Sequence, residues 1–205
     1  MVQSLNYLRE SPSQTAGPSV HIGLAPGAAG FHTFAQQLGQ VIAADGVPGE
    51  RIRVEGAVFD GTGAPVKDIL LEVWQADAAG IYPHPEDPLH GHTAPGYPGW
   101  GRVISDFDSG LWGFDTIKPG SVAGRAGRVQ APHISFWLVS RGINIGLNTR
   151  MYFPDEAAAN EGDPVLGSIE QRHRVATLIA TKTAPGLYRF DIHLQGPLET
   201  VFIDI

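Results

Sequence analysis

The chain has 205 residues, a formal net charge of −7 and no cysteine. The lack of cysteine excludes disulfides, thiolate zinc sites, iron–sulfur clusters and a cysteine nucleophile. The sequence contains no run of lysine and arginine and no apolar stretch of membrane-spanning length, and residues 1–10 lack the basic and apolar regions of a signal peptide. We therefore expect a cytoplasmic protein that binds neither nucleic acid nor a membrane.

Residues 1–30 are expected to form an extended arm. The segment 11–19 contains two prolines and no hydrophobic periodicity, and proline restricts both its own backbone and that of the preceding residue. Alternation over 20–24 predicts a short strand through which the arm docks. Residues 31–205 are expected to form a single domain, because no internal boundary is visible.

The rest of the chain is predicted to be almost entirely β. Apolar spacing favours a short helix over 33–44, and an acidic, alanine-rich segment favours one or two helical turns over 155–162. Gly and Pro are abundant, at 26 and 16 residues, which is typical of short strands joined by turns. The predicted strands are 51–58, 69–76, 111–116, 132–140, 149–153, 174–182, 186–195 and 200–204. This spacing predicts a β-sandwich with little helix.

A long loop over 81–101 carries five prolines and three histidines. Loops of this length without secondary structure are usually functional or bind a partner. Its histidines and carboxylates form one candidate metal set, made of His84, Glu86, Asp87, His90 and His92. The alternative is that these histidines are solvated or packed on a neighbour, as is usual in irregular loops.

Several short motifs occur in a characteristic order along nearly the whole chain. They lie at 11–18, 21–24, 72–77, 116–120, 131–134, 141–144, 149–153 and 188–192. As an ordered set they resemble the intradiol ring-cleavage dioxygenases, and among them the protocatechuate 3,4-dioxygenases. The resemblance implies a β-sandwich that assembles from two homologous chain types into large hetero-oligomers. It also implies ferric, O₂-dependent cleavage of protocatechuate to 3-carboxy-cis,cis-muconate in the β-ketoadipate route.

The ligand positions of that family can be followed residue by residue. Its iron-binding chains hold Fe(III) with two tyrosines and two histidines, because hard phenolate oxygens stabilise the ferric state. Tyr82 and His133 match one of each, whereas Val122 and Ser135 replace the others, and Gln130 replaces an assisting arginine. The resemblance therefore implies that this is the alpha-type chain, which binds no metal itself. The Fe(III) would be held by a partner beta-type chain.

In chains of the alpha type, the arm and one arginine lie beside the substrate bound to the partner's iron. The resemblance assigns this role to Thr15, Gly17, Pro18 and Ser19 of the arm and to Arg141. Arginine suits the carboxylate of the substrate because its planar fork can donate two parallel hydrogen bonds. Ser19 departs from the tyrosine that is common at its position.

Two other functions remain open from the sequence. One is a self-sufficient dioxygenase with a rearranged metal site, which would be coloured when expressed alone. The other is a stand-alone β-sandwich that binds aromatic compounds without chemistry, which would be a stable monomer.

Overall fold

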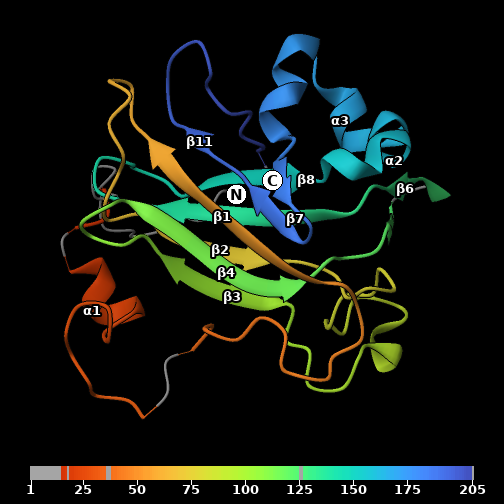
Figure 1. The fold of residues 1–205 in the computed structure, drawn as a ribbon, viewed down its shortest axis with the longest axis horizontal. Helices are drawn as coiled ribbons and strands as arrows, with labels where there is room; N and C mark the ends of the chain where they lie inside the picture. Colours follow the sequence, from red (N-terminus) through yellow and green to blue (C-terminus); the bar gives the residue numbers. More distant parts are fainter. Residues whose placement is uncertain (1–14, 18, 36–37, 125–126, 205) are drawn as a thin grey trace, which may run out of the picture.

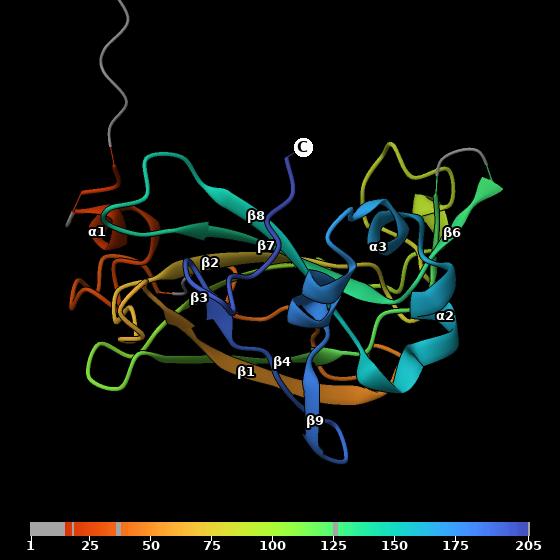
Figure 2. The same cartoon turned by 90° about the horizontal axis from the view of Figure 1, so that it is seen from above.

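The computed structural model describes residues 15–17, 19–35, 38–124 and 127–204. Two β-sheets lie face to face, as Figure 2 shows from the edge of both layers. In the first sheet, β1 pairs with β4 in antiparallel orientation, and with β10 and β11 in parallel orientation. β9 extends this sheet beyond β10. The bounds are β1 Arg51–Phe59, β4 Leu111–Ile117, β9 Thr181–Ala184, β10 Leu187–Arg189 and β11 Ile192–His193.

The second sheet is antiparallel throughout, in the order β3, β2, β7, β8. Its strands are β2 Leu70–Trp74, β3 Trp100–Ile104, β7 His133–Val139 and β8 Leu147–Tyr152. The short strands β5 (Val122–Ala123) and β6 (Val129–Gln130) pair with each other only. The register places Ser135 of β7 opposite Trp74 on one side and Arg150 on the other. These three positions therefore form one row across the sheet.

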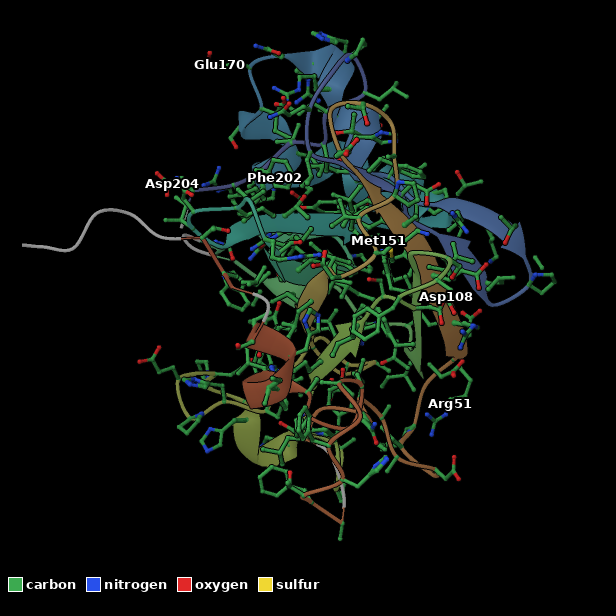
Figure 3. The ribbon with its side chains drawn as sticks, turned by 90° about the vertical axis from the view of Figure 1, so that its left-hand side faces the viewer. Arg51, Asp108, Met151, Glu170, Phe202 and Asp204 are labelled. Atoms are coloured by element: carbon green, nitrogen blue, oxygen red, sulfur yellow. The ribbon has the colours of Figure 1, made fainter. Side chains whose placement is uncertain are left out.

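The core lies between the two sheets. Val54 from β1, Val73 from β2 and Phe136 from β7 are all fully or almost fully buried there. Met151 of β8 belongs to the same cluster and lies inside the body of the molecule in Figure 3. A slip of one residue in any of these strands would turn its apolar face to the outside, so the core fixes the register. It also fixes which side chains the second sheet presents on its outer face.

Short helices lie at opposite ends of the sandwich (Figure 1). One end carries α1 (Val20–Leu24), and the other carries α2 (Ala157–Gly162) and α3 (Pro164–Ser168). Among the described residues, 3₁₀ turns cover His90–His92, Pro154–Glu156 and Arg172–Leu178. Asp163 begins α3 by accepting hydrogen bonds from the amides of Val165 and Leu166. Within the described ranges, every helix is too short or too polar to cross a bilayer.

The predicted fold class is confirmed, and so are most of its strands. The predicted strands 51–58, 69–76, 111–116, 132–140 and 149–153 correspond to β1, β2, β4, β7 and β8. The predicted turns of helix over 155–162 are also present. The predicted strand 186–195 is divided into β10 and β11. The boundary at residue 30 between arm and domain stays a prediction.

The two N-terminal predictions were wrong in type. Residues 20–24 form helix α1 rather than a strand, because their amides bond locally, for example Ala25 N to His21 O at 2.8 Å. The described part of 33–44, which leaves out 36–37, contains turns and bends but no helix. Gly39 adopts a positive φ of 80° and its carbonyl accepts a hydrogen bond from the amide of Arg102. This bond holds the segment against β3, which an α-helix at the same place would not allow.

Three further segments differ from the prediction. The strand β3 begins at Trp100 inside the predicted loop, and Gly101 is required there because a Cβ would lie 2.2 Å from a side-chain carbon of Ile42. Most of the predicted strand 174–182 is the 3₁₀ segment, in which Val175 and Leu178 pack on the α3 side of the molecule. The predicted strand 200–204 is not part of a ladder, although Ile203 N donates to Asn148 O of β8 at 2.8 Å.

Candidate functional site

Tyr82 and His133, the two surviving ligand-type residues, contact each other directly. Tyr82 follows the turn after β2, and its ring stacks on Trp74 with centroids 5.6 Å apart and planes at 9°. His133 is the first residue of β7 and is almost fully buried. The Tyr82 hydroxyl lies 3.2 Å from Nε2 of His133. The sequence therefore identified a pair that the fold brings together.

The hydrogen bonds of His133 define its state. Its Nδ1 lies 2.8 Å from the carbonyl oxygen of Ala131, which can only accept, so Nδ1 carries the proton. Burial, reinforced by the nearby Arg150 guanidinium, lowers the pKa of His133 to about 4. The imidazole is therefore neutral at pH 7, and Nε2 accepts from the Tyr82 hydroxyl. The lone pair that a metal would need is already used.

Tyr82 is held as a neutral phenol. Burial raises the pKa of its hydroxyl, and Asp87 acts in the same direction, whereas the Arg150 charge acts in the opposite one. A ferric site in this chemistry needs an ionised phenolate. The raised pKa therefore opposes the ionisation that iron binding would require.

Arg150 of β8 lies next to these donors. Its Nη1 donates to Oε1 of Gln130 at 2.6 Å, and the register places it opposite Ser135. Val122 is buried and offers no donor atom. A ferric ion here would meet two neutral donors, one valine and a guanidinium of like charge. The residues present therefore do not fit the iron that the family resemblance implies.

An open pocket of about 520 Å³ lies above these groups. We call it the Arg150 pocket. Its lining residues are Trp74, Gly80, Tyr82, His84, Glu86, Asp87, Pro88, Leu89, Val122, Ala123, Gln130 and Arg150. Three sequence positions that the metal argument singled out, at Tyr82, Val122 and Gln130, thus line a single cavity.

The histidine-rich loop does not gather a metal set in the ranges that the structure describes. Nδ1 of His84 accepts from the amide of Glu86 at 3.2 Å, and Nδ1 of His90 lies 2.9 Å from the carbonyl of Asp87. The Asp87 carboxylate accepts from the amides of Tyr82 and Leu89. These polar groups hold the loop in shape through its own backbone.

The arm and the Arg141 loop form a second feature, at the end of the sandwich that carries α1. The Thr15 hydroxyl accepts from the amide of Gly142 at 2.6 Å and lies 3.4 Å from the carbonyl of Ser140. Arg141 is largely exposed and forms an ion pair with Asp68 through its Nε. The structure thus brings Thr15 and the Arg141 loop together across the chain.

A groove of about 1070 Å³ runs beside Arg141, and we call it the arm groove. Its lining residues are Asp60, Gly61, Thr62, Pro65, Val66, Lys67, Asp68, Phe107, Arg141, Gly142, Ile143, Leu194 and Gln195. His21 of α1 is buried and packs its ring edge-on against Phe107 with centroids 5.3 Å apart. Burial lowers the pKa of His21, which favours the neutral imidazole. This neutral ring packs α1 against Phe107 beside the groove.

The other arm residues are placed only in part. Gly17 and Ser19 are exposed and precede α1, and the carbonyls of both accept amide hydrogen bonds from that helix. Pro18 lies outside the described residues. None of these positions is excluded from substrate contact, and that role stays a prediction.

Sequence reasoning missed Arg150, Asp68 and His21. Arg150 lies inside the motif 149–153, but its importance depends on the cross-strand pairing with Ser135. Asp68 precedes β2 and meets Arg141 only in the folded chain. His21 is part of the motif 21–24, and its burial against Phe107 could not be read from the alternation alone.

Comparison with known proteins places this geometry in context. The profile of a family described as "Dioxygenase" matches residues 29–196. The chain belongs to this family. A protein called "Protocatechuate 3,4-dioxygenase alpha chain" from Pseudomonas putida is 50% identical, and the match covers 98% of each chain. A "Protocatechuate 3,4-dioxygenase beta chain" from Burkholderia cepacia is 40% identical, covering 72% of this chain and 66% of its own length.

Solved dioxygenases share the fold. The dioxygenase domain of a carbohydrate-binding fusion protein from Streptomyces sp. SirexAA-E is 24% identical and covers 78% of this chain and 86% of its own. Its TM-score is 0.52. The resemblance to intradiol dioxygenases is therefore confirmed in both sequence and fold. Dioxygenases of this family generally use iron, which sharpens the contrast with Val122, Ser135 and Arg150 in this chain.

Proposed function

We propose that this chain is the alpha-type, non-iron-binding subunit of a protocatechuate 3,4-dioxygenase. A homologous beta-type chain holds the Fe(III), and the two assemble in the cytoplasm into a large hetero-oligomer. One observation carries the proposal. The chain matches an alpha chain over 98% of its length, and its pocket is lined by Val122, at a position where the family has a ligand, and by the cation Arg150.

In the assembled enzyme this chain contributes part of the substrate site. The iron would supply Lewis-acid polarisation of the catechol during its cleavage by O₂ to 3-carboxy-cis,cis-muconate. Arg141 would bind the substrate carboxylate. Its Nε donates to Asp68, which orients the side chain, and the two terminal nitrogens carry further N–H groups that can donate to a carboxylate. Those nitrogens suit bidentate recognition of a carboxylate.

Thr15 positions the arm beside this arginine. Its hydroxyl bonds the backbone on both sides of Arg141, at Gly142 N and Ser140 O. The arm reaches Gly17 and Ser19 directly after this anchor, so these residues are held near the same carboxylate. Because the proline before Ser19 restricts the chain, the arm loses little freedom when it orders against a partner.

The test is the kinetics of the assembled complex with Arg141→Ala. The catalytic efficiency kcat/KM for protocatechuate should fall. The fall should correspond to a loss of about 1–3 kcal/mol of transition-state stabilisation, the usual size for a lost charged hydrogen bond. The efficiency for catechol, which lacks the carboxylate, should change little. Iron content and assembly should equal those of the unmodified complex.

Arg53→Ala is the matched control, because Arg53 is also part of an exposed ion pair but lies on β1 and does not line the arm groove. Ser19→Tyr in the same complex should change the preference among catechols that differ in their ring substituent. Unchanged kcat/KM for every catechol with both Arg141→Ala and Ser19→Tyr would exclude a shared substrate site. Size-exclusion chromatography with and without the beta-type chain separates the subunit from a stand-alone binding module.

A further inference from the structure

The Arg150 pocket combines a partly buried cation with a flat aromatic wall. We propose that it is a binding site for a small aromatic carboxylate, built from the residues of this chain alone. This inference goes beyond the proposed subunit function, which assigns no ligand to this pocket.

The first argument is the charge of Arg150. Its guanidinium is half-buried and donates to the neutral side-chain oxygen of Gln130. Among the residues that the structure describes, no carboxylate lies within ion-pair distance of it. Burying a charge without a counter-charge costs free energy, so an anion that enters the pocket gains a strong and geometrically matched partner.

The other titratable groups around the pocket leave this cation available. His133 and Tyr82 are neutral for the reasons given above. The Asp87 carboxylate accepts from two backbone amides, at 2.9 and 2.8 Å, and so is already bound within its loop. Glu86 and His84 are exposed at the rim, where solvent and salt screen their charges.

The second argument is the shape and polarity of the walls. Trp74 and Tyr82 both line the cavity, and their rings stack on each other nearly parallel, at 9°, so the wall at this place is aromatic. Val122, Pro88 and Leu89 add apolar area around it. Aromatic rings prefer such offset-stacked and edge contacts, and a pocket of about 520 Å³ accommodates a single-ring ligand.

The two features together select the ligand class. A ring against Trp74 and Tyr82 would place an attached carboxylate toward Arg150, whose planar fork can bind both of its oxygens. A neutral aromatic compound would gain only the ring contacts. An aliphatic carboxylate would gain only the ion pair. The arginine thus supplies, next to Tyr82 and His133, the positive charge that a metal supplies in iron-binding members of the family.

The experiment is equilibrium dialysis of the full chain with benzoate and, in parallel, with its neutral counterpart benzamide. Benzoate should bind at about one equivalent and at least about tenfold more tightly than benzamide, the ratio expected for a charge-assisted hydrogen bond. Arg150→Gln should abolish this preference. Ala123→Trp, at an exposed position in the lining, should block both ligands while leaving Arg150 in place.

Arg53→Gln is the control, since it removes an exposed, ion-paired arginine of β1 that does not line the Arg150 pocket and should leave benzoate binding unchanged. Circular dichroism of each variant verifies that it is folded. If the single chain does not stay in solution, the same dialysis on the complex with the beta-type chain should show one equivalent of benzoate fewer per alpha-type chain with Arg150→Gln, because the shared substrate site is still present. Equal affinity for benzoate and benzamide would overturn the proposal. So would benzoate binding to the single chain that survives Arg150→Gln or Ala123→Trp, or that disappears with Arg53→Gln, and so would a complex that loses no equivalent of benzoate with Arg150→Gln.

Discussion

Acidification should destabilise this protein through His133 in a way that can be calculated. The imidazole is 1% exposed, and burial and Arg150 lower its pKa to about 4 from the ordinary value of 6.5. The folded protein therefore binds this proton more weakly than the unfolded chain does. Above pH 6.5 both states are neutral at this residue, and the stability is fully present. As the pH falls below 6.5 the unfolded chain takes up the proton first, and stability is lost until about pH 4.

The size of this effect follows from the difference between the two pKa values. Each pH unit corresponds to about 1.4 kcal/mol, so the loss between pH 6.5 and about 4 is on the order of 3 to 4 kcal/mol. Because His133 is almost fully buried, screening by solvent reduces this figure little. A loss of this size is a large fraction of the stability of a typical domain.

Urea unfolding measured by tryptophan fluorescence at several pH values between 7.5 and 4.5 provides the assay. His133→Gln removes the titrating group, so its free energy of unfolding should fall less with acidification than that of the unmodified chain. His173→Gln, which removes an exposed histidine, is the matched control. If the unmodified chain and His133→Gln lost stability in parallel over this range, the assignment of a buried, neutral His133 would be wrong.

Three other predictions concern the metal and the arm. The chain purified alone should contain far less than one iron per chain by metal analysis, and near-stoichiometric iron that Tyr82→Phe removes would contradict the subunit assignment. Val122→Tyr combined with Ser135→His should allow some iron uptake but negligible ring cleavage, because Arg150 still places a like charge beside the rebuilt ligands; rapid oxygen consumption by this double variant alone would refute that reasoning. Thr15→Val should weaken arm docking by about 1 kcal/mol, since it removes the hydroxyl that bonds the Arg141 loop, and limited proteolysis of the arm should become faster; an unchanged cleavage rate would show that this hydroxyl does not hold the arm.

The strands of the core were the part of the fold most open to prediction. Val54 and Val58 alternate with polar residues, and the apolar run 132–140 allows one face of β7 to be buried, so their types follow from burial alone. The segment 33–44 could not be predicted in this way, because its conformation depends on a hydrogen bond from Arg102 to Gly39. Contacts between segments so far apart in the sequence leave no periodic signal within either one.

In the candidate sites, too, some residues could be predicted from the sequence and others depend on contacts made only in the folded chain. Tyr82 and His133 were found because their residue types match a known ligand pattern, and the fold places them 3.2 Å apart. Arg150 was overlooked because it has no such pattern. Its role comes from the pairing of β7 with β8, which brings it level with Ser135. A side chain that acquires its function through register can be recognised only when the strand pairing is known.

The hydrogen bond between Tyr82 and His133 also bears on how the chain is produced in a cell. Proteins whose folded state includes a metal gain stability from it, so their folded yield follows the supply of that metal. Here the Tyr82 hydroxyl and Nε2 of His133 form a hydrogen bond with each other, and the neighbouring positive charge is the Arg150 side chain rather than a metal ion. We therefore expect the folding of this chain to be independent of iron concentration, and we expect it to accumulate in a folded form during iron starvation. Iron limitation would then lower the amount of folded protein only for a chain that binds the metal.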